Sequence, residues 1–221
     1  MNEIRKLSNG ITVVLEPMDY LKTVAFGVWV KVGSRNEVKE NNGIAHVIEH
    51  MLFKGTKKRT SRQIADDMAK IGGNVNAYTT KECTSYYTTT LSEHLPQAIE
   101  IISDMINHST FEEEALEKEK GVIIEEIDMY DDSPEDLVHE MLQQMIWKDH
   151  PLGYIISGTK ENVCNMTSEE IRNFMQEHYV AENMLISIAG HFNLEEVMLQ
   201  LEEAFSKIPH KKKQEELIAP T

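Results

Sequence analysis

Stretches of alternating or β-branched residues predict six strands along the chain. A short first strand precedes the turn signal Asn9-Gly10, which is typical of a β-hairpin. Val, Ile, Thr and aromatic residues are enriched in the stretches that follow, as expected for strands. The remaining predicted strands are residues 11–15, 23–32, 74–78, 84–91 and 184–189.

Apolar residues three and four positions apart predict helices between these strands. We expect Ser61 to cap the second helix, and Thr110 with Glu113 to form a capping box on the fourth. Strands and helices come in clusters and do not alternate strictly, so the predicted class is α+β, with a largely antiparallel β-sheet and helices packed on one face. The predicted helices are residues 42–55, 61–71, 95–107, 111–130, one that opens at Ser133-Pro134, and 194–205.

The helix at residues 42–55 carries two histidines and a glutamate within five positions. At 100° per residue, His46, Glu49 and His50 share one side, and the apolar residues lie on the other. Histidines four apart stand one above the other, close enough to bind one metal ion. Glu49 lies beside them, where it can act on a water bound to that metal. The alternative is that this side of the helix is simply solvated.

A catalytic zinc site needs a third protein ligand and keeps one position open for water. Glu119 and Glu126, in the helix at 111–130, are carboxylates whose neighbours at three and four residues are all apolar. Burying an unpaired carboxylate costs several kcal/mol, so such groups indicate a metal or a cationic partner. We therefore expect Glu126 to be the third ligand and Glu119 to support a histidine.

Two alternatives to this ligand set stay open. The two glutamates can instead form buried ion pairs with lysine or arginine. Cys83 or Cys164 can supply a thiolate as the third ligand, because thiolates bind zinc well.

Composition and net charge limit the classes of partner and the cellular compartment that we expect. The chain has 221 residues, of which 41% are hydrophobic and 27% are charged, as in ordinary globular proteins. A net charge of −15 argues against nucleic acid or an anionic membrane as a partner. No apolar run approaches the roughly 18 residues of a membrane span, and residues 1–10 do not read as a signal peptide. With two distant cysteines, we expect no disulfide framework and a cytoplasmic location.

Several segments together resemble the insulinase/pitrilysin family of zinc peptidases, and in particular bacterial relatives of the mitochondrial processing peptidase β-subunit. The resemblance runs from about residue 3 to residue 210, and H-x-x-E-H at 46–50 is the inverzincin motif. It implies a processing-peptidase-like metallohydrolase half in which His46, His50 and Glu126 hold one Zn²⁺. The segments that carry it are residues 33–37, 43–56, 72–79, 119–127 and 151–153.

The same resemblance implies the roles of further residues. Glu49 is expected to be the catalytic base and Glu119 to support catalysis. An extended peptide or small-protein substrate is expected to pair with the edge of the strand near residues 74–79. The implied contact residues there are Asn74, Asn76, Ala77 and Tyr78. For Asn76 the alternative is that it only completes the sheet.

Members of this branch carry two homologous halves, and the metal-free half closes over the site. We therefore expect residues 1–208 to form a catalytic metallopeptidase domain and residues 209–221 to form a linker or tail. A second homologous half or subunit, or another copy in a homo-oligomer, is expected to complete the site.

The predicted function is that of a zinc-dependent endopeptidase that hydrolyses peptide bonds of extended peptides through a metal-activated water. One alternative is an S-ribosylhomocysteine-lyase-like metalloenzyme, which requires Cys83 or Cys164 at the metal. Another is a non-catalytic structural subunit of a larger complex. Such subunits resemble these peptidases but have lost site residues, whereas the four key positions are intact here.

Overall fold

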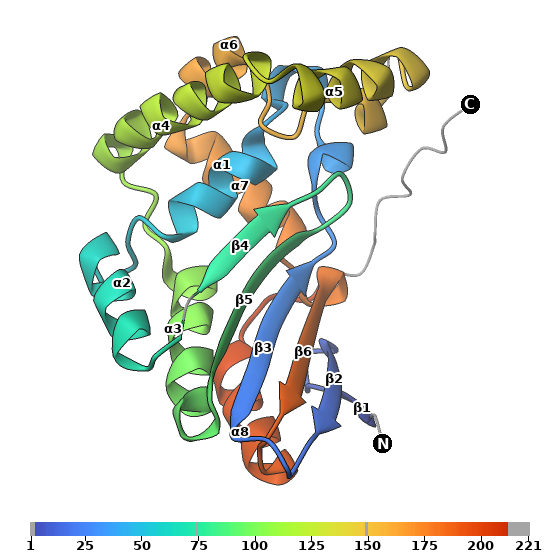
Figure 1. Ribbon diagram of the computed structural model, residues 1–221. Coiled ribbons are helices and arrows are strands. Elements are labelled where there is room, and N and C mark those ends of the chain that lie inside the picture. Colours follow the sequence, from blue (N-terminus) through green and yellow to red (C-terminus); the bar gives the residue numbers. More distant parts are fainter. Residues whose placement is uncertain (1–2, 74, 149, 212–221) are drawn as a thin grey trace.

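The six predicted strands pair into one sheet in the computed structural model, which describes residues 3–73, 75–148 and 150–211 (Figure 1). The strand order is β1-β2-β6-β3-β5-β4. Neighbouring strands are antiparallel except β2 and β6, which are parallel. The strands are β1 (Glu3–Lys6), β2 (Thr12–Pro17), β3 (Thr23–Val30), β4 (Asn76–Thr79), β5 (Thr84–Leu91) and β6 (Met184–Gly190).

Helices cover one face of this sheet. In Figure 1, α3 and α8 lie behind the strands, and α4 and α5 cross the top of the view. The predicted α+β class with a largely antiparallel sheet is therefore confirmed. The helices are α1 (Ile44–Leu52), α2 (Ser61–Lys70), α3 (Leu95–His108), α4 (Glu113–Asp131), α5 (Pro134–Ile146), α6 (Lys160–Asn165), α7 (Ser168–His178) and α8 (Leu194–Phe205).

The central strand β3 shows how the sequence separates the two faces. Val24, Phe26 and Val28 are buried beneath the helices, whereas Thr23 and Ala25 are exposed on the other face. A period of two places alternate side chains on opposite faces of a sheet. The open face carries polar, small and aromatic residues, so only the helical face builds the main core.

Two predicted helix caps are wrong. Thr60, not Ser61, caps α2, because its hydroxyl accepts a hydrogen bond from the backbone of Gln63. Thr110 does not cap α4, which begins at Glu113 without a side-chain cap. The backbone of Thr110 donates instead to the carbonyl of Gly55, a contact between segments far apart in sequence.

Two helices, α6 and α7, escaped prediction, although the sequence contains signals for both. The hydroxyls of Thr159 and Thr167 cap them. Thr167 and Glu170 form a full capping box, a pattern readable from the sequence.

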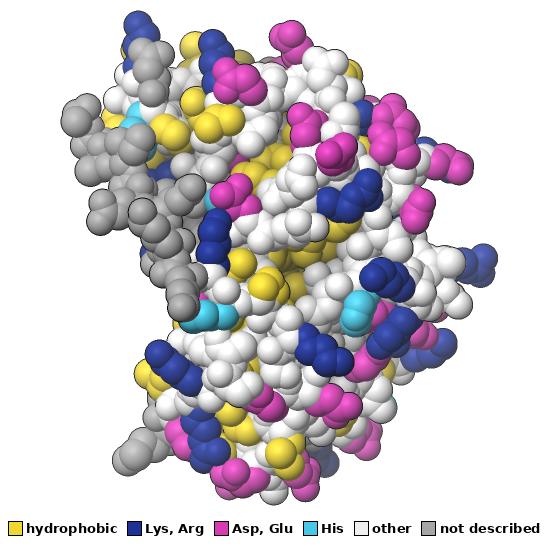
Figure 2. Space-filling model, turned by 180° about the vertical axis from the view of Figure 1, so that it is seen from behind, with side chains coloured by type: hydrophobic (Ala, Val, Ile, Leu, Met, Phe, Trp, Pro, Cys, Tyr) yellow, Lys and Arg dark blue, Asp and Glu magenta, His cyan; other side chains and the backbone are white. Residues whose placement is uncertain are grey.

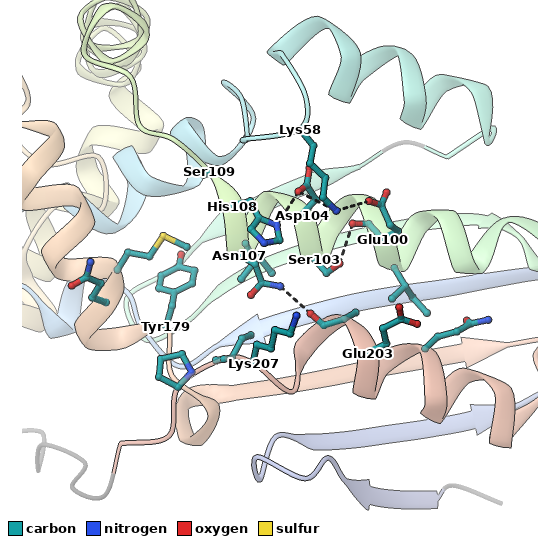
Figure 3. A pocket seen from close by; sticks show the side chains of 18 of the residues that line it. Lys58, Glu100, Ser103, Asp104, Asn107, His108, Ser109, Tyr179, Glu203 and Lys207 are labelled. Atoms are coloured by element: carbon teal, nitrogen blue, oxygen red, sulfur yellow. Dashed lines mark hydrogen bonds and ion pairs between the residues drawn. The ribbon is translucent and has the colours of Figure 1, made fainter.

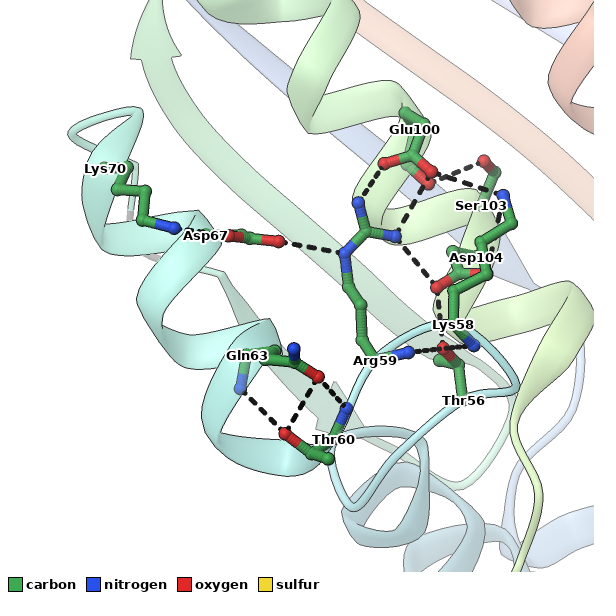
Figure 4. A network of polar contacts seen from close by, with 10 residues as sticks. All are labelled: Thr56, Lys58, Arg59, Thr60, Gln63, Asp67, Lys70, Glu100, Ser103 and Asp104. Atoms are coloured by element: carbon green, nitrogen blue, oxygen red, sulfur yellow. Dashed lines mark hydrogen bonds and ion pairs between the residues drawn. The ribbon is translucent and has the colours of Figure 1, made fainter.

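A buried carboxylate, Asp104 on α3, fastens the loop that follows α1 (Figure 4). Its Oδ2 accepts hydrogen bonds from Thr56 at 2.7 Å and from Arg59 at 2.9 Å. Arg59 also bonds to Asp67 of α2 and Glu100 of α3. The loop after α1, the helix that carries the candidate metal ligands His46 and His50, is thus fixed to α2 and α3.

The connection from α3 to α4 has an unusual backbone. Phe111 has φ of +50°, the only non-glycine residue with positive φ in the described part of the chain. A bulky residue in this region is strained and needs support from its surroundings. Arg172 of α7 provides it by donating to the carbonyls of Thr110 and Phe111, each at 3.2 Å. This strained turn sets the direction in which α4 leaves α3.

None of the helices in the described ranges is both long enough and apolar enough to cross a membrane.

We expect Asp104→Ala to lower the free energy of unfolding by about 3 kcal/mol, because it leaves the half-buried guanidinium of Arg59 with fewer partners in a buried network. Chemical denaturation followed by circular dichroism measures this change. Asp66→Ala is the matched control, since Asp66 is exposed and pairs with the exposed Arg62 at 3.7 Å. It should change stability by less than about 0.5 kcal/mol. Equal effects of the two substitutions would contradict a structural role for the Asp104 network.

Candidate metal centre

The N-terminus of α1 is fixed by a buried carboxylate. Glu37 accepts hydrogen bonds from the backbone of Gly43 and Ala45, at 2.8 and 2.9 Å, and from the side chain of Asn42. A negative charge at this end of a helix is favourable. Gly43 has φ of +102°, and a Cβ there would lie 2.8 Å from the carbonyl oxygen of Ser157. The helix therefore starts at a defined point and in a defined direction.

The three polar residues of α1 share one side, as the helical wheel predicted. His46 is buried, and Glu49 and His50 are half-buried. This side is not a freely solvated face, because α4 and β4 both contact α1. The simple alternative of a wet helix surface is therefore wrong.

Glu126 of α4 meets both histidines. Its Oε2 lies 3.8 Å from His46 Nε2 and 3.5 Å from His50 Nε2. One ligand atom from each of the three residues lies within 4.8 Å of the others, and no other such group occurs in the described ranges. These distances are too long for good hydrogen bonds. They are close to the separation of about 3.3 Å between two ligands of one tetrahedral zinc, given bonds of about 2.0–2.1 Å. The donor set and its spacing thus fit a zinc ion.

Glu119 supports His50 from the far side of the ring. Its Oε1 lies 2.8 Å from His50 Nδ1, and its Oε2 lies 2.6 Å from Lys54 Nζ. A carboxylate at Nδ1 favours a proton there, which leaves Nε2 free as a metal ligand. Glu119 is buried as predicted, and the alternative of an ion pair is also realised, through Lys54.

Glu126 was selected because its apolar neighbours predicted a buried position, and this reason holds only in part. Its neighbours Val122, Met129 and Tyr130 are apolar but 43–61% exposed, so they do not bury this carboxylate. Glu126 itself is half-buried, and it points to the histidines. Sequence reasoning thus selected a residue that joins the cluster, but it overestimated how deeply this end of α4 is covered.

The two histidines have opposite pKa shifts in the absence of a metal. Burial and the neighbouring charge of His50 lower the pKa of His46 to about 4. Burial alone would also lower the pKa of His50, but the hydrogen bond with Glu119 and the nearby carboxylate of Glu126 raise it to about 9. A metal would have to displace the proton from His50, because ligating imidazoles are neutral on the metal-binding nitrogen.

Glu49 lies beside the cluster but outside it. Burial raises the pKa of its carboxyl, although a hydrogen bond from Thr79 opposes this shift. The Thr79 hydroxyl donates to Glu49 Oε2 at 2.5 Å. A carboxyl group with a raised pKa next to a candidate metal site is suited to accept a proton and to return it.

The predicted substrate strand, β4, is the last strand of the sheet. Asn76 and Tyr78 are exposed, whereas Ala77 is half-buried against the core. Tyr78 packs edge-on against Trp29 and Tyr87 on the open face of the sheet. The outer edge of β4 has no partner strand in the described chain, which leaves room for pairing. Asn74, also predicted to bind substrate, lies outside the described residues.

Neither cysteine belongs to the cluster. Cys83 lies in the turn between β4 and β5 next to Thr80, and Cys164 is exposed on α6. The lyase-like alternative requires one of them at the metal, so the structure does not support it.

A wide hollow lies elsewhere, between α3, α7 and α8 (Figure 3). It measures about 770 Å³ and includes Asn107, His108, Tyr179 and Lys207 among its lining residues. From the helical side, Figure 2 shows hydrophobic side chains at the bottom of a depression with charged groups around it. It shares no residue with the metal cluster, so its size does not identify the site of chemistry.

Comparison with known proteins assigns the family. The model of the insulinase peptidases, family M16, matches residues 12–160. The chain belongs to this family. A second model, the M16 inactive domain, matches residues 165–221. The boundary between the two matches does not divide the sheet, because β6 of the second part lies between β2 and β3 of the first.

Relatives in several lineages share about half of their length with this chain. It is 45% identical over 185 residues to the uncharacterized zinc protease YmxG of Bacillus subtilis, which covers 84% of this chain and 45% of the relative. It is 38% identical over 205 residues to the probable β-subunit of the mitochondrial processing peptidase of Arabidopsis thaliana, covering 93% of this chain and 39% of that one. The chain therefore spans about half the length of the curated relatives it matches, or less.

Solved structures show the same fold. A protease from Helicobacter pylori superposes with a TM-score of 0.91 at 26% identity, over all of this chain and 53% of the other. An M16 inactive domain from Pseudomonas fluorescens reaches a TM-score of 0.92 at 16% identity, over all of this chain and 54% of that one. At that identity the likeness concerns the fold alone, so the fold by itself does not establish catalysis.

Three residues of the site escaped sequence reasoning. Thr79 contacts Glu49, Lys54 contacts Glu119, and Glu37 holds the start of α1. Lys54 was detectable in principle, because it follows the end of α1 closely and lies only four residues after His50. The pairing of Thr79 with Glu49 depends on the way β4 packs across α1, which no local pattern reveals.

Glu126→Ala should weaken zinc binding by about 100-fold or more, because it removes one of the three convergent donors. Metal analysis after dialysis, and competition with a chromophoric chelator, measure the change. Glu125→Ala is the matched control, since the neighbouring Glu125 is exposed on the same helix. Equal zinc retention by both variants would exclude Glu126 as a ligand.

Proposed function

We propose that this chain is the zinc-binding catalytic half of an endopeptidase that hydrolyses peptide bonds of extended peptides or small proteins. Family membership and the zinc-protease relatives support a metallopeptidase of the M16 kind. The observation that carries the proposal is the convergence of His46, His50 and Glu126, with Glu49 beside them. We propose one Zn²⁺ per chain, held by these three ligands. When bound, it would supply Lewis acidity and lower the pKa of a coordinated water to about 7.

The protein groups around this ion have separate roles in the proposal. Glu49 accepts a proton from the attacking water and returns it to the leaving amine, as a general base and then a general acid. Glu119 holds the His50 ring through Nδ1 and so orients its Nε2. Lys54 balances the charge of Glu119.

The substrate is proposed to bind as an added strand along β4. An extended peptide can pair with the outer edge of a sheet through main-chain hydrogen bonds, whatever its side chains are. Asn74, Asn76, Ala77 and Tyr78 are the proposed contact residues. The edge position of β4 and its link to Glu49 through Thr79 support this assignment.

A second homologous half is proposed to cover an apolar face that this chain leaves exposed. On α5, Val138, Met141, Leu142 and Met145 follow helical spacing, and each is more than half exposed. Apolar side chains in such a continuous row mark an interaction surface. The helix that carries Glu126, α4, contacts α5 and has exposed apolar residues of its own. A relative named as a subunit of a processing peptidase is consistent with assembly from homologous parts.

We further propose that residues 1–208 act as one catalytic domain followed by a linker or tail at 209–221. A cytoplasmic location is the simplest proposal for a chain with two free cysteines. Structural neighbours include a periplasmic protease, so fractionation of cells has to test this point.

Glu49→Gln should lower kcat of the complete enzyme containing this chain by about 10²–10⁴-fold, because it removes the general base while keeping the size of the side chain. Zinc content should stay at one per chain, measured by metal analysis on the same sample. Glu125→Gln, on the exposed side of α4, is the control and should leave both values unchanged. Retained hydrolysis in Glu49→Gln would refute the assignment of the base. Absence of any bound metal in the unmodified protein would favour a structural subunit.

The double substitution Leu142→Glu/Met145→Glu should weaken association with the second half by at least about 30-fold, because it places charges in an apolar contact. Sedimentation of this chain mixed with its second homologous half or subunit measures the association. Gln144→Glu lies on the same helix outside the apolar row and serves as control. If both variants bind equally well, the α5 face is not the interface.

A further inference from the structure

Thr79 makes the only hydrogen bond that the Glu49 carboxylate forms within the described residues. Its hydroxyl donates to Oε2, and Oε1 has no protein partner there. The two residues come from different elements, since Glu49 lies on α1 and Thr79 ends β4. The contact is therefore not a consequence of local chain geometry.

The Thr79 hydroxyl is held in a defined position. Threonine is branched at Cβ, so its side chain has few rotamers in a strand. Its backbone is paired with Thr84 of β5, and the turn that follows is fixed by Thr80, whose backbone donates to the carbonyl of Cys83. The same turn accepts hydrogen bonds from the backbone of Ser34 and Arg35. Because the backbone is held at Thr79 and in the turn that follows, the Thr79 hydroxyl is a fixed donor. The more flexible side chain of Glu49 is the acceptor that adjusts to it.

A carboxylate that accepts one fixed hydrogen bond loses rotational freedom about its terminal bond. With Oε2 held by Thr79, Oε1 remains the oxygen free to take a proton. Proton transfer requires hydrogen-bond distance between base and water, and a misplacement of about 1 Å can cost 10²-fold in rate. The position of the hydroxyl thus decides where the free oxygen points.

We propose that Thr79 is a positioning residue for hydrolysis, and that it aligns Glu49 with the strand on which the substrate lies. This inference rests on the function proposed above. Because Thr79 belongs to the edge strand β4, one hydroxyl connects the peptide-binding edge with the base. Strand β4 then positions both the scissile bond of the substrate and the carboxylate of Glu49. Thr79 acts through Glu49 and is not itself proposed to touch the reacting atoms.

The test uses the complete enzyme and an extended peptide whose cleavage releases a fluorophore. Thr79→Val keeps the shape of the side chain but removes the donor, so kcat should fall by about 10–100-fold while KM changes by less than about threefold. Thr79→Ser keeps a hydroxyl and should recover most of kcat. Zinc content should be unchanged in both. Thr89→Val is the matched control, because Thr89 is exposed on the adjacent strand and its hydroxyl has no partner among the described residues, and its kcat should equal that of the unmodified enzyme.

A double-mutant cycle with Glu49→Gln separates positioning from a merely structural role. If Thr79 acts only through the base, Thr79→Val should lower kcat little further once Glu49 has been replaced. Fully additive losses, a rise in KM at constant kcat, loss of zinc, or failure of Thr79→Ser to recover activity would each overturn the proposal. If Thr79→Val does not fold, the ratio of kcat for Thr79→Ser and Thr79→Ala decides in the same way. Unchanged turnover in Glu49→Gln would refute the proposed function itself, whereas a loss in Glu49→Gln with normal turnover in Thr79→Val would refute only the role of Thr79.

Discussion

The contact between α1 and α4 is the interaction on which the rest of the site depends. Two imidazoles on α1 occupy a covered side of the helix, where polar groups need partners. Glu119 and Glu126 of α4 are seven residues apart, about two helical turns, so they reach the histidines from the same side of α4. Glu119 forms a direct hydrogen bond, whereas Glu126 stands off at distances that suit an ion between the side chains. The difference in length is what the proposed roles require, with Glu119 orienting His50 and Glu126 acting as a ligand.

Long-range contacts fix both helices from outside the cluster. Glu37 holds the beginning of α1, and the Asp104 network holds the loop after it. The strained Phe111, kept in place by Arg172, directs the chain into α4. Each of these anchors comes from a different part of the sequence. Precise placement of metal ligands on rigid helices requires such support, because a site that is loosely held loses affinity and rate.

Much of the fold and of the candidate site could be predicted from the sequence, but the grounds for each prediction were of different strength. The His46–His50 side of α1 followed from helix geometry alone, and the six strands followed from residue type and turn signals. Glu126 was selected by its apolar neighbours, although several of them are exposed and belong to a surface that we propose another half covers. Thr110 looked like a helix cap because a threonine precedes a glutamate by three residues. The competing bond to Gly55 comes from a segment more than fifty residues away, which no local pattern contains. Thr79 was missed for the same physical reason, since a strand pattern tells which face a residue takes but not which helix crosses it.

Active and inactive M16 domains share one fold, so function depends on a few side chains and not on the fold itself. A sheet with the same architecture occurs in a domain described as inactive, so the helices and strands serve as a frame. Within that frame, Glu119 and Lys54 hold the His50 ring from one side, and Glu126 lies 3.8 and 3.5 Å from the Nε2 atoms of His46 and His50. A divalent cation bound by His46, His50 and Glu126 would take the place of the proton on His50 Nε2, because a ligating nitrogen has to be deprotonated. The shared frame therefore permits metal binding, and the identity of these three side chains decides whether it occurs.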